Sequence, residues 1–241
     1  MMNILRPRTA LFADRVDAGL QLAQKLSAYA GRTDVVVLGL PRGGVPVAAE
    51  VAKELRAPLD IFLVRKLGVP GHEELAMGAI ASGGVQILNQ DVVQPLRIPM
   101  QVIDRVAAHE QQELARREQL YRSGHSALQL EGRTVILVDD GLATGASMSA
   151  AVAGLRTQHP AQIVVAVPTA APETCEMFED KVDEIVCAET PQPFMGVGFW
   201  YENFNQTTDD EVRRLLEEVR QMPYAQRAES PSAAQERQHD E

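Results

Sequence analysis

The most constraining feature of this sequence is a short apolar run that ends in two adjacent acidic residues and a glycine-containing turn. The run Val-Ile-Leu-Val at residues 135–138 is followed by Asp139 and Asp140, and then by Gly141 and Gly145 in the turn. A short run rich in β-branched residues predicts a buried strand. Open α/β sheets bind their ligands at the carboxyl ends of parallel strands. The segment therefore predicts an α/β fold with a ligand site at this strand end.

The turn after the acidic pair has the features of a phosphate cradle. Residues 144–147 would direct backbone N–H groups, the small hydroxyl of Thr144 and a helix N-terminus at one point. Asp139 and Asp140 cannot hold the same anion, because like charges repel, so they suit hydroxyl groups or a cation beside it. The pattern favours a ligand with a phosphate next to a diol, such as a ribose 5-phosphate. Neither a Gly-x-Gly-x-x-Gly turn nor the Lys-Ser/Thr ending of a P-loop is found.

Residues 139–147, Asp-Asp-Gly-Leu-Ala-Thr-Gly-Ala-Ser, resemble the phosphoribosyl-pyrophosphate (PRPP) motif of type I phosphoribosyltransferases. The apolar strand, the acidic pair and the Thr-Gly-small-Ser ending all match. The resemblance implies that Asp139 and Asp140 hold the ribose hydroxyls, directly or through metal-bound water. It assigns the 5-phosphate of PRPP to the loop residues Gly141, Ala143, Thr144, Gly145, Ala146 and Ser147. It also implies Mg²⁺ as the cofactor, bridging pyrophosphate and ribose with few direct protein ligands.

A second glycine-rich turn follows an apolar strand predicted at residues 34–40. It contains Arg42, Gly43 and Gly44, and two adjacent glycines permit close approach of the backbone to a ligand. Alone, the pattern describes an ordinary strand–helix turn equally well. In the resembled family the loop at this place binds pyrophosphate, commonly with an unusual peptide geometry. The resemblance therefore assigns pyrophosphate binding to these three residues.

Two cations follow the next apolar strand, predicted at residues 59–64. Arg65 and Lys66 precede residues 67–78, a segment rich in glycine and polar groups that predicts a mobile loop. The resembled family has a flexible loop here that closes over pyrophosphate, so both cations are catalytic candidates for stabilising the leaving group. Solvated charges at a strand end are the simpler interpretation. His72 is a weaker acid–base candidate, since a lone loop histidine is more often just polar.

Residues 190–205 hold five aromatic residues, including the only tryptophan of the chain. This segment interrupts the alternation of strands and helices, and aromatic side chains in it could wall a flat ligand. In the resembled family a variable hood binds the nucleobase or another acceptor. The candidates for acceptor binding are Phe194, Phe199, Trp200 and Tyr201. An apolar cluster covering the end of the sheet would use the same residues, and the two roles can coexist.

The remaining pattern alternates apolar strands with helices. Helices are predicted at residues 14–30, 45–56, 101–122, 148–158, 172–178 and 209–220, and strands at 161–168 and 184–188. The fold class is thus α/β, with a mostly parallel central sheet and helices on both faces, as in the type I phosphoribosyltransferase fold. A hairpin signal at residues 82–84 predicts a β-ribbon carrying the flexible loop. Residues 1–13 are a lead-in, 14–220 the domain with its hood, and 221–241 a disordered tail.

Composition limits the class of protein and its partners. A length of 241 residues suits one large α/β domain. The net charge of −10 argues against nucleic acid as a partner, and no run reaches transmembrane length, so no membrane is expected. No signal peptide is visible, and two thiols, Cys175 and Cys187, suit a reducing cytoplasm. Cys187 is expected to be a small core residue.

The resemblance implies a Mg²⁺-dependent transferase that moves the phosphoribosyl group of PRPP to a nucleobase-like acceptor and releases pyrophosphate. Ala143 replaces the acid that some enzymes for 6-oxopurines carry before Thr-Gly, and the loop alone is similar to that of adenine phosphoribosyltransferases. The order of motifs over residues 10–220 looks most like a group of uncharacterised, predicted bacterial phosphoribosyltransferases. A non-catalytic PRPP or nucleotide sensor and a hydrolase are the alternatives. The helix at 101–122 has either a solvated polar face or a contact in a homodimer.

Overall fold

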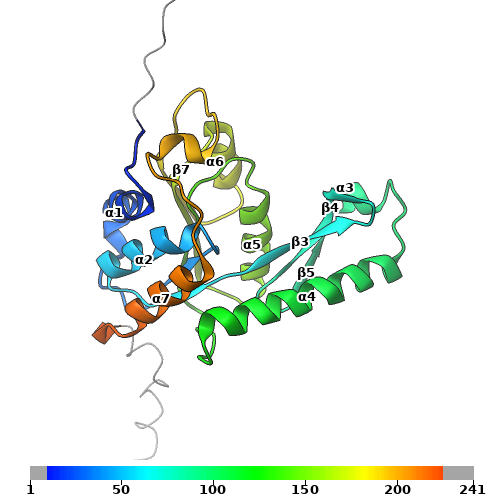
Figure 1. The fold of residues 1–241 in the computed structure, drawn as a ribbon, viewed down its shortest axis with the longest axis horizontal. Helices are drawn as coiled ribbons and strands as arrows, with labels where there is room; N and C mark the ends of the chain where they lie inside the picture. The colour runs from blue at the N-terminus through cyan, green and yellow to red at the C-terminus, as the bar shows by residue number, and fades with distance from the viewer. Residues whose placement is uncertain (1–9, 225–241) are drawn as a thin grey trace, which may run out of the picture.

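The computed structural model describes residues 10–224. Its central sheet has five parallel strands in the order β2-β1-β6-β7-β8 (Figure 1). These are β1 (Val35–Gly39), β2 (Leu59–Ile61), β6 (Thr134–Val138), β7 (Gln162–Thr169) and β8 (Glu184–Glu189). β1 and β6 are neighbours with Gly39 opposite Val138, so the two loops that leave these strands start side by side.

Helices cover both faces of this sheet. One face carries α1 (Arg15–Lys25), α2 (Gly44–Leu55) and α7 (Asp209–Arg220), and the other carries α5 (Ala146–Arg156) and α6 (Pro172–Glu179). Successive strand residues point to opposite faces, so Val37 packs with the first set and Val36 with the second. Short 3₁₀ turns are present at Ser27–Tyr29 and Val197–Trp200. The predicted α/β class, with a mostly parallel sheet between two helical layers, is confirmed.

A second sheet of three antiparallel strands extends from the core as an arm (Figure 1). It consists of β3 (Val64–Val69), β4 (His72–Ala81) and β5 (Val85–Leu88), followed by the short α3 (Gln90–Val93) and the long α4 (Met100–Arg122). The hairpin predicted at residues 82–84 is confirmed. The loop predicted at residues 67–78 is wrong, because most of it pairs as β3 and β4 across a turn at Pro70 and Gly71. Register shifts around Gly68 accommodate its irregular pattern.

One buried ion pair fastens the arm to the core. Asp60 of β2 is 3% exposed and accepts a hydrogen bond of 3.1 Å from Nε of Arg122, at the end of α4. The same carboxylate accepts hydrogen bonds from the backbone N–H groups of Ile61 and Leu128. A buried charge is tolerated only when it is paired and hydrogen-bonded in this way. The base of the arm is therefore fixed, although its strands are partly exposed.

The two cysteines form a disulfide, which corrects the expectation of two free thiols. Cys175 lies on α6 and Cys187 on β8, with their Cα atoms 6.6 Å apart. Both pack at the margin of an apolar core, so the core position expected for Cys187 is partly met. The pairing depends on α6 folding back against β8, and no local sequence pattern reports that contact.

Two further expectations concern the segments at the two ends of the chain, the predicted lead-in and the predicted tail. Residues 1–9, most of the predicted lead-in, lie outside the described residues, as do residues 225–241 of the predicted tail. Within residues 10–224, no helix is long and apolar enough to cross a membrane.

Candidate functional site

The two glycine-containing loops meet at the carboxyl edge of the sheet because β1 and β6 are neighbours. A Cβ on Gly43 would lie 2.0 Å from Oδ2 of Asp140, and a Cβ on Gly44 would lie 2.7 Å from the carbonyl oxygen of Val138. Both distances are far shorter than a van der Waals contact, so any side chain at these two positions would displace the acidic pair. The structure therefore brings the Arg-Gly-Gly turn and the acidic pair to one place.

The Arg-Gly-Gly turn has an unusual backbone geometry, as the family resemblance implied. The peptide bond between Pro41 and Arg42 is cis. Nη1 of Arg42 lies 3.7 Å from Oδ1 of Asp209, the first residue of α7. Tyr121 of α4 donates its hydroxyl hydrogen to the same oxygen over 2.7 Å. Asp209 thus orients Arg42 and links the turn to both α4 and α7.

The two carboxylates of the acidic pair have different surroundings. Nε of Arg15 donates to Oδ2 of Asp140 over 2.9 Å, and Arg15 itself lies over the ring of Phe204, 3.9 Å from its centroid. Burial raises the pKa of Asp139 well above its usual value, and the Asp140 charge raises it further. Burial also raises the pKa of Asp140, while Arg15 opposes that shift. Asp139 is therefore the carboxylate that gains more from a cation or from hydroxyl donors at the site.

The predicted phosphate loop is a turn between β6 and α5, supported from outside by α6. Gly145 has a φ of 73° immediately before α5 begins, a conformation that favours glycine. A Cβ there would also lie 2.7 Å from the ring of Phe178. Thr174 of α6 donates its hydroxyl hydrogen to the carbonyl oxygen of Ala143 over 2.6 Å. The turn is held in place while the first N–H groups of α5 stay available for an anion.

The cations of the ribbon have different neighbours. Arg65 pairs with Glu110 of α4, with 2.6 Å between Nη2 and Oε2, so its guanidinium is held along the arm. Lys66 lines a cavity of about 280 Å³ together with Ser147 at the start of α5. Lys66 is thus close to the phosphate loop, while His72 is exposed where β4 begins. The catalytic roles of Arg65 and Lys66 stay predictions.

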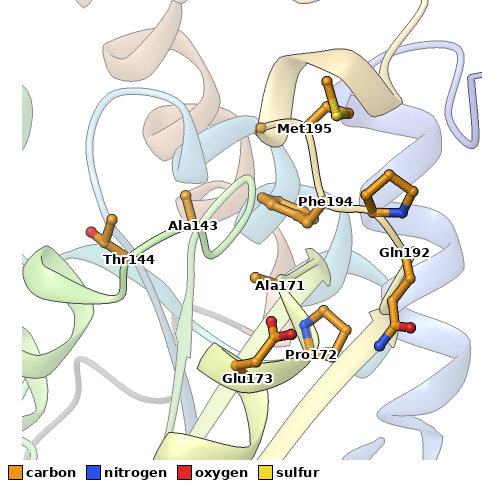
Figure 2. Close-up of a pocket in the computed structure, with 10 residues that line it drawn as sticks. Ala143, Thr144, Ala171, Pro172, Glu173, Gln192, Phe194 and Met195 are labelled. Carbon is orange, nitrogen blue, oxygen red and sulfur yellow. The ribbon is translucent and has the colours of Figure 1, made fainter.

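A larger cavity of about 850 Å³ adjoins the phosphate loop (Figure 2). It is bounded by the turn after β6, the start of α6 and the segment after β8. Its lining residues are Ala143, Thr144, Ala171, Pro172, Glu173, Gln192, Pro193, Phe194, Met195 and Gly196. Among the aromatic candidates, Phe194 reaches this cavity, whereas Trp200 and Tyr201 are buried and Phe199 is 52% exposed.

The other aromatic residues of the segment pack beneath the acidic pair. Tyr201 donates its hydroxyl hydrogen to the carbonyl oxygen of Asp140, and its burial raises its pKa. Its ring lies 4.9 Å from that of Phe204, on which Arg15 rests. Val197 packs against Gly141 so closely that a Cβ on that glycine would overlap it. Tyr201 and Phe204 thus form a supporting apolar cluster, whereas acceptor binding by the aromatic candidates stays a prediction.

Three residues of the site escaped prediction from sequence: Arg15, Glu173 and Gln192. Arg15 is 125 positions from Asp140, and its local pattern is that of an ordinary helix start. Glu173 lies in the first turn of α6, where an acid is also favoured by the helix dipole. No local signal separates these roles, so only the fold assigns them to the site.

The chain is similar to proteins from several sources. Residues 10–77 and 70–202 match the family described as a phosphoribosyl transferase domain. Two curated Mycobacterium tuberculosis proteins, from strains CDC 1551 and H37Rv, are each named "Putative phosphoribosyl transferase" and are 49% identical over 207 residues. That alignment covers 86% of this chain and 46% of each relative, so the chain spans about half the length of the curated relatives it matches.

A solved structure has the same fold. The crystal structure of TT1426 from Thermus thermophilus matches with a TM-score of 0.76 and 42% sequence identity. The match covers 86% of this chain and 98% of that one. The arrangement of sheet and helices described above is therefore shared with a protein whose structure was determined by experiment.

Proposed function

Because this chain belongs to the phosphoribosyl transferase domain family, we propose that it transfers the 5-phosphoribosyl group of PRPP to a nucleobase-like acceptor. The observation that carries the proposal is the meeting of three parts at one sheet edge. The Arg-Gly-Gly turn touches the acidic pair, and the Thr-Gly turn continues from that pair into α5. The 850 Å³ cavity opens beside them. These parts match the pyrophosphate, ribose, 5-phosphate and acceptor portions of the reacting molecules.

The reaction breaks the bond between the anomeric carbon and the pyrophosphate oxygen. Positive charge develops on the ribose ring and negative charge on the leaving group, so positioning and electrostatic stabilisation are sufficient and no protein nucleophile is needed. Asp139 would accept hydrogen bonds from the ribose hydroxyls, with Asp140 held alongside by Arg15. Residues 144–147 would bind the 5-phosphate, and Arg42 would lie next to the pyrophosphate.

The acidic pair also suits the Mg²⁺ ion that the family implies. Mg²⁺ prefers oxygen ligands and usually keeps several waters. Asp139 is a buried carboxyl with a raised pKa, which a nearby cation would relieve. Residues 10–224 contain no cluster of three or more side chains suited to hold a metal, so the ion would be bound mainly by PRPP oxygens. When bound, Mg²⁺ would neutralise charge on the departing pyrophosphate.

The direct test is release of pyrophosphate from PRPP in the presence of Mg²⁺ and a panel of bases, with a control lacking any base. Release that requires one base supports the transferase and identifies the acceptor. Release that needs no base would replace the proposal with hydrolysis. Absence of release, with PRPP still raising the melting temperature, would replace it with a sensor that binds PRPP without turnover.

A further inference from the structure

The cavity beside the phosphate loop carries charge of only one sign. Its ten described lining residues include one carboxylate, Glu173, one amide, Gln192, and one hydroxyl, Thr144, but no lysine or arginine. The others are apolar residues or glycine. An acceptor carrying its own carboxylate would gain no cation from these residues, and it would face a like charge.

Glu173 is placed to contact whatever occupies this cavity. Figure 2 shows its carboxylate projecting from the first turn of α6 toward the space between Ala171 and Ala143. Among the described residues, it forms no ion pair with a lysine, arginine or histidine. Its hydrogen-bonding capacity is therefore available to a ligand. Ala143 leaves the facing wall of the cavity without a charge.

The position of Glu173 relative to the phosphate loop is fixed by its neighbours. The next residue, Thr174, is hydrogen-bonded to the carbonyl oxygen of Ala143 over 2.6 Å. The residue after that, Cys175, is joined to β8 by the disulfide. On the opposite side of the cavity, Phe194 offers a flat apolar surface. A planar ligand would thus meet an aromatic ring on its face and a carboxylate at its edge.

We infer that Glu173 determines which acceptor is used, by accepting a hydrogen bond from an N–H or amino group at the edge of the acceptor. The preferred substrate class is an uncharged or cationic nitrogen heterocycle with such a donor, and heterocycles bearing a carboxylate are rejected. This inference rests on the proposed function, because it treats the cavity as the acceptor site.

The test compares acceptor kinetics in three variants at saturating PRPP and Mg²⁺. The panel contains adenine, cytosine and hypoxanthine as donors of N–H groups, and orotate and nicotinate as carboxylated heterocycles. Glu173→Ala, which removes both acceptor oxygens, should raise the KM of the preferred N–H donor by about tenfold or more. The KM for PRPP, measured separately at saturating base, should be unchanged. Glu173→Lys should shift the preference toward orotate or nicotinate. Glu176→Ala, at an exposed acid one turn along α6 and outside the cavity, is the matched control and should resemble the wild type.

A binding measurement separates this inference from the proposed function. Saturation-transfer NMR reports binding of each base to the protein with ribose 5-phosphate and Mg²⁺, and it needs no turnover. Loss of adenine or cytosine binding in Glu173→Ala, without pyrophosphate release by any form, would keep the assignment of Glu173 as the residue that selects the base and overturn the transferase. The inference is overturned if the wild type prefers a carboxylated base or binds no base of the panel. It is also overturned if Glu173→Ala and Glu173→Lys leave both affinity and KM unchanged.

Discussion

The edge of the central sheet and the ribbon arm both carry residues predicted to bind PRPP, but they hold them in different ways. Every residue of β1 and β6 is buried, so the loops that leave these strands start from fixed positions. Most residues of β3 and β5 are partly exposed. The position of Arg65 on the ribbon depends on its partner Glu110, whereas Gly44 is confined by backbone atoms of β6 and Asp139.

The difference indicates where rigidity and movement are located. Regions with few buried apolar contacts open at low free energy, whereas core strands open only with global unfolding. The sheet edge therefore offers fixed positions for the ribose and phosphate groups that the proposed function assigns to it. The arm is fastened at its base by Asp60 and Arg122, and its more exposed strands are expected to open at lower free energy than the sheet edge.

The largest expected effect is on the free energy of unfolding, and it comes from breaking the Asp60–Arg122 ion pair at the base of the arm. Asp60→Ala should lower the free energy of unfolding by about 3–5 kcal/mol, because it removes the buried carboxylate that pairs with Arg122 and that accepts hydrogen bonds from two backbone N–H groups, leaving Arg122 with only Glu118 of its own helix as an acidic partner. Urea denaturation followed by circular dichroism measures the change. Asp104→Ala, an exposed acid on α4, is the control and should stay within about 0.5 kcal/mol of the wild type. A loss below about 1 kcal/mol for Asp60→Ala would mean that other contacts hold the arm.

The acidic pair should matter for ligand binding and little for folding. Asp139→Asn combined with Asp140→Asn should weaken PRPP affinity by about 100-fold, equivalent to about 3 kcal/mol, because charge-assisted hydrogen bonds are lost. The melting temperature without ligand should change by less than about 4 °C, since burial disfavours both charges and asparagine at position 140 still offers an oxygen that can accept the hydrogen bond from Arg15. Calorimetric titration and thermal unfolding measure the two quantities. A large loss of apo stability would instead make the pair a structural element.

A matched pair of arginine variants compares the two regions directly. Arg42→Ala at the sheet edge should lower PRPP affinity by about tenfold, since a charge next to pyrophosphate is removed. Arg65→Ala on the ribbon should lower it by less than about threefold, because Arg65 is paired with Glu110. The measurement is the PRPP dissociation constant in Mg²⁺. Equal losses would show that ligand binding draws Arg65 away from Glu110 and into the site.

The smallest effect is a pH dependence of apo stability at Asp139. Its pKa is raised in the folded protein, so between the usual carboxyl pKa of 3.8 and the raised value the native state binds more protons than the unfolded state. Stability from this group is therefore present at low pH and is lost as pH rises through that interval. The melting temperature of Asp139→Asn should gain on that of the wild type as pH increases above about 4. A constant difference across pH would contradict the raised pKa.

Local sequence patterns were sufficient to predict the elements whose formation depends mainly on residues close together in the chain. The buried strand at residues 134–138 and the helix at Asp209–Arg220 follow from apolar periodicity and capping. The turn at Gly145 follows from its need for a positive φ. The acidic pair and the Arg-Gly-Gly turn were each recognisable from a few adjacent residues, because short segments are enough to bind a phosphate or a diol.

Tertiary structure alone decided which of these segments meet and what surrounds them. Arg15 reaches Asp140, Cys175 pairs with Cys187, and Glu173 enters the cavity because particular helices and strands became neighbours. The pairing of residues 67–78 as a ribbon likewise depends on hydrogen bonds between strands. A sequence without regular apolar alternation does not indicate which strands will pair. Such contacts join residues far apart in the chain or on different elements. Their energies are realised only once the sheet order places those elements together.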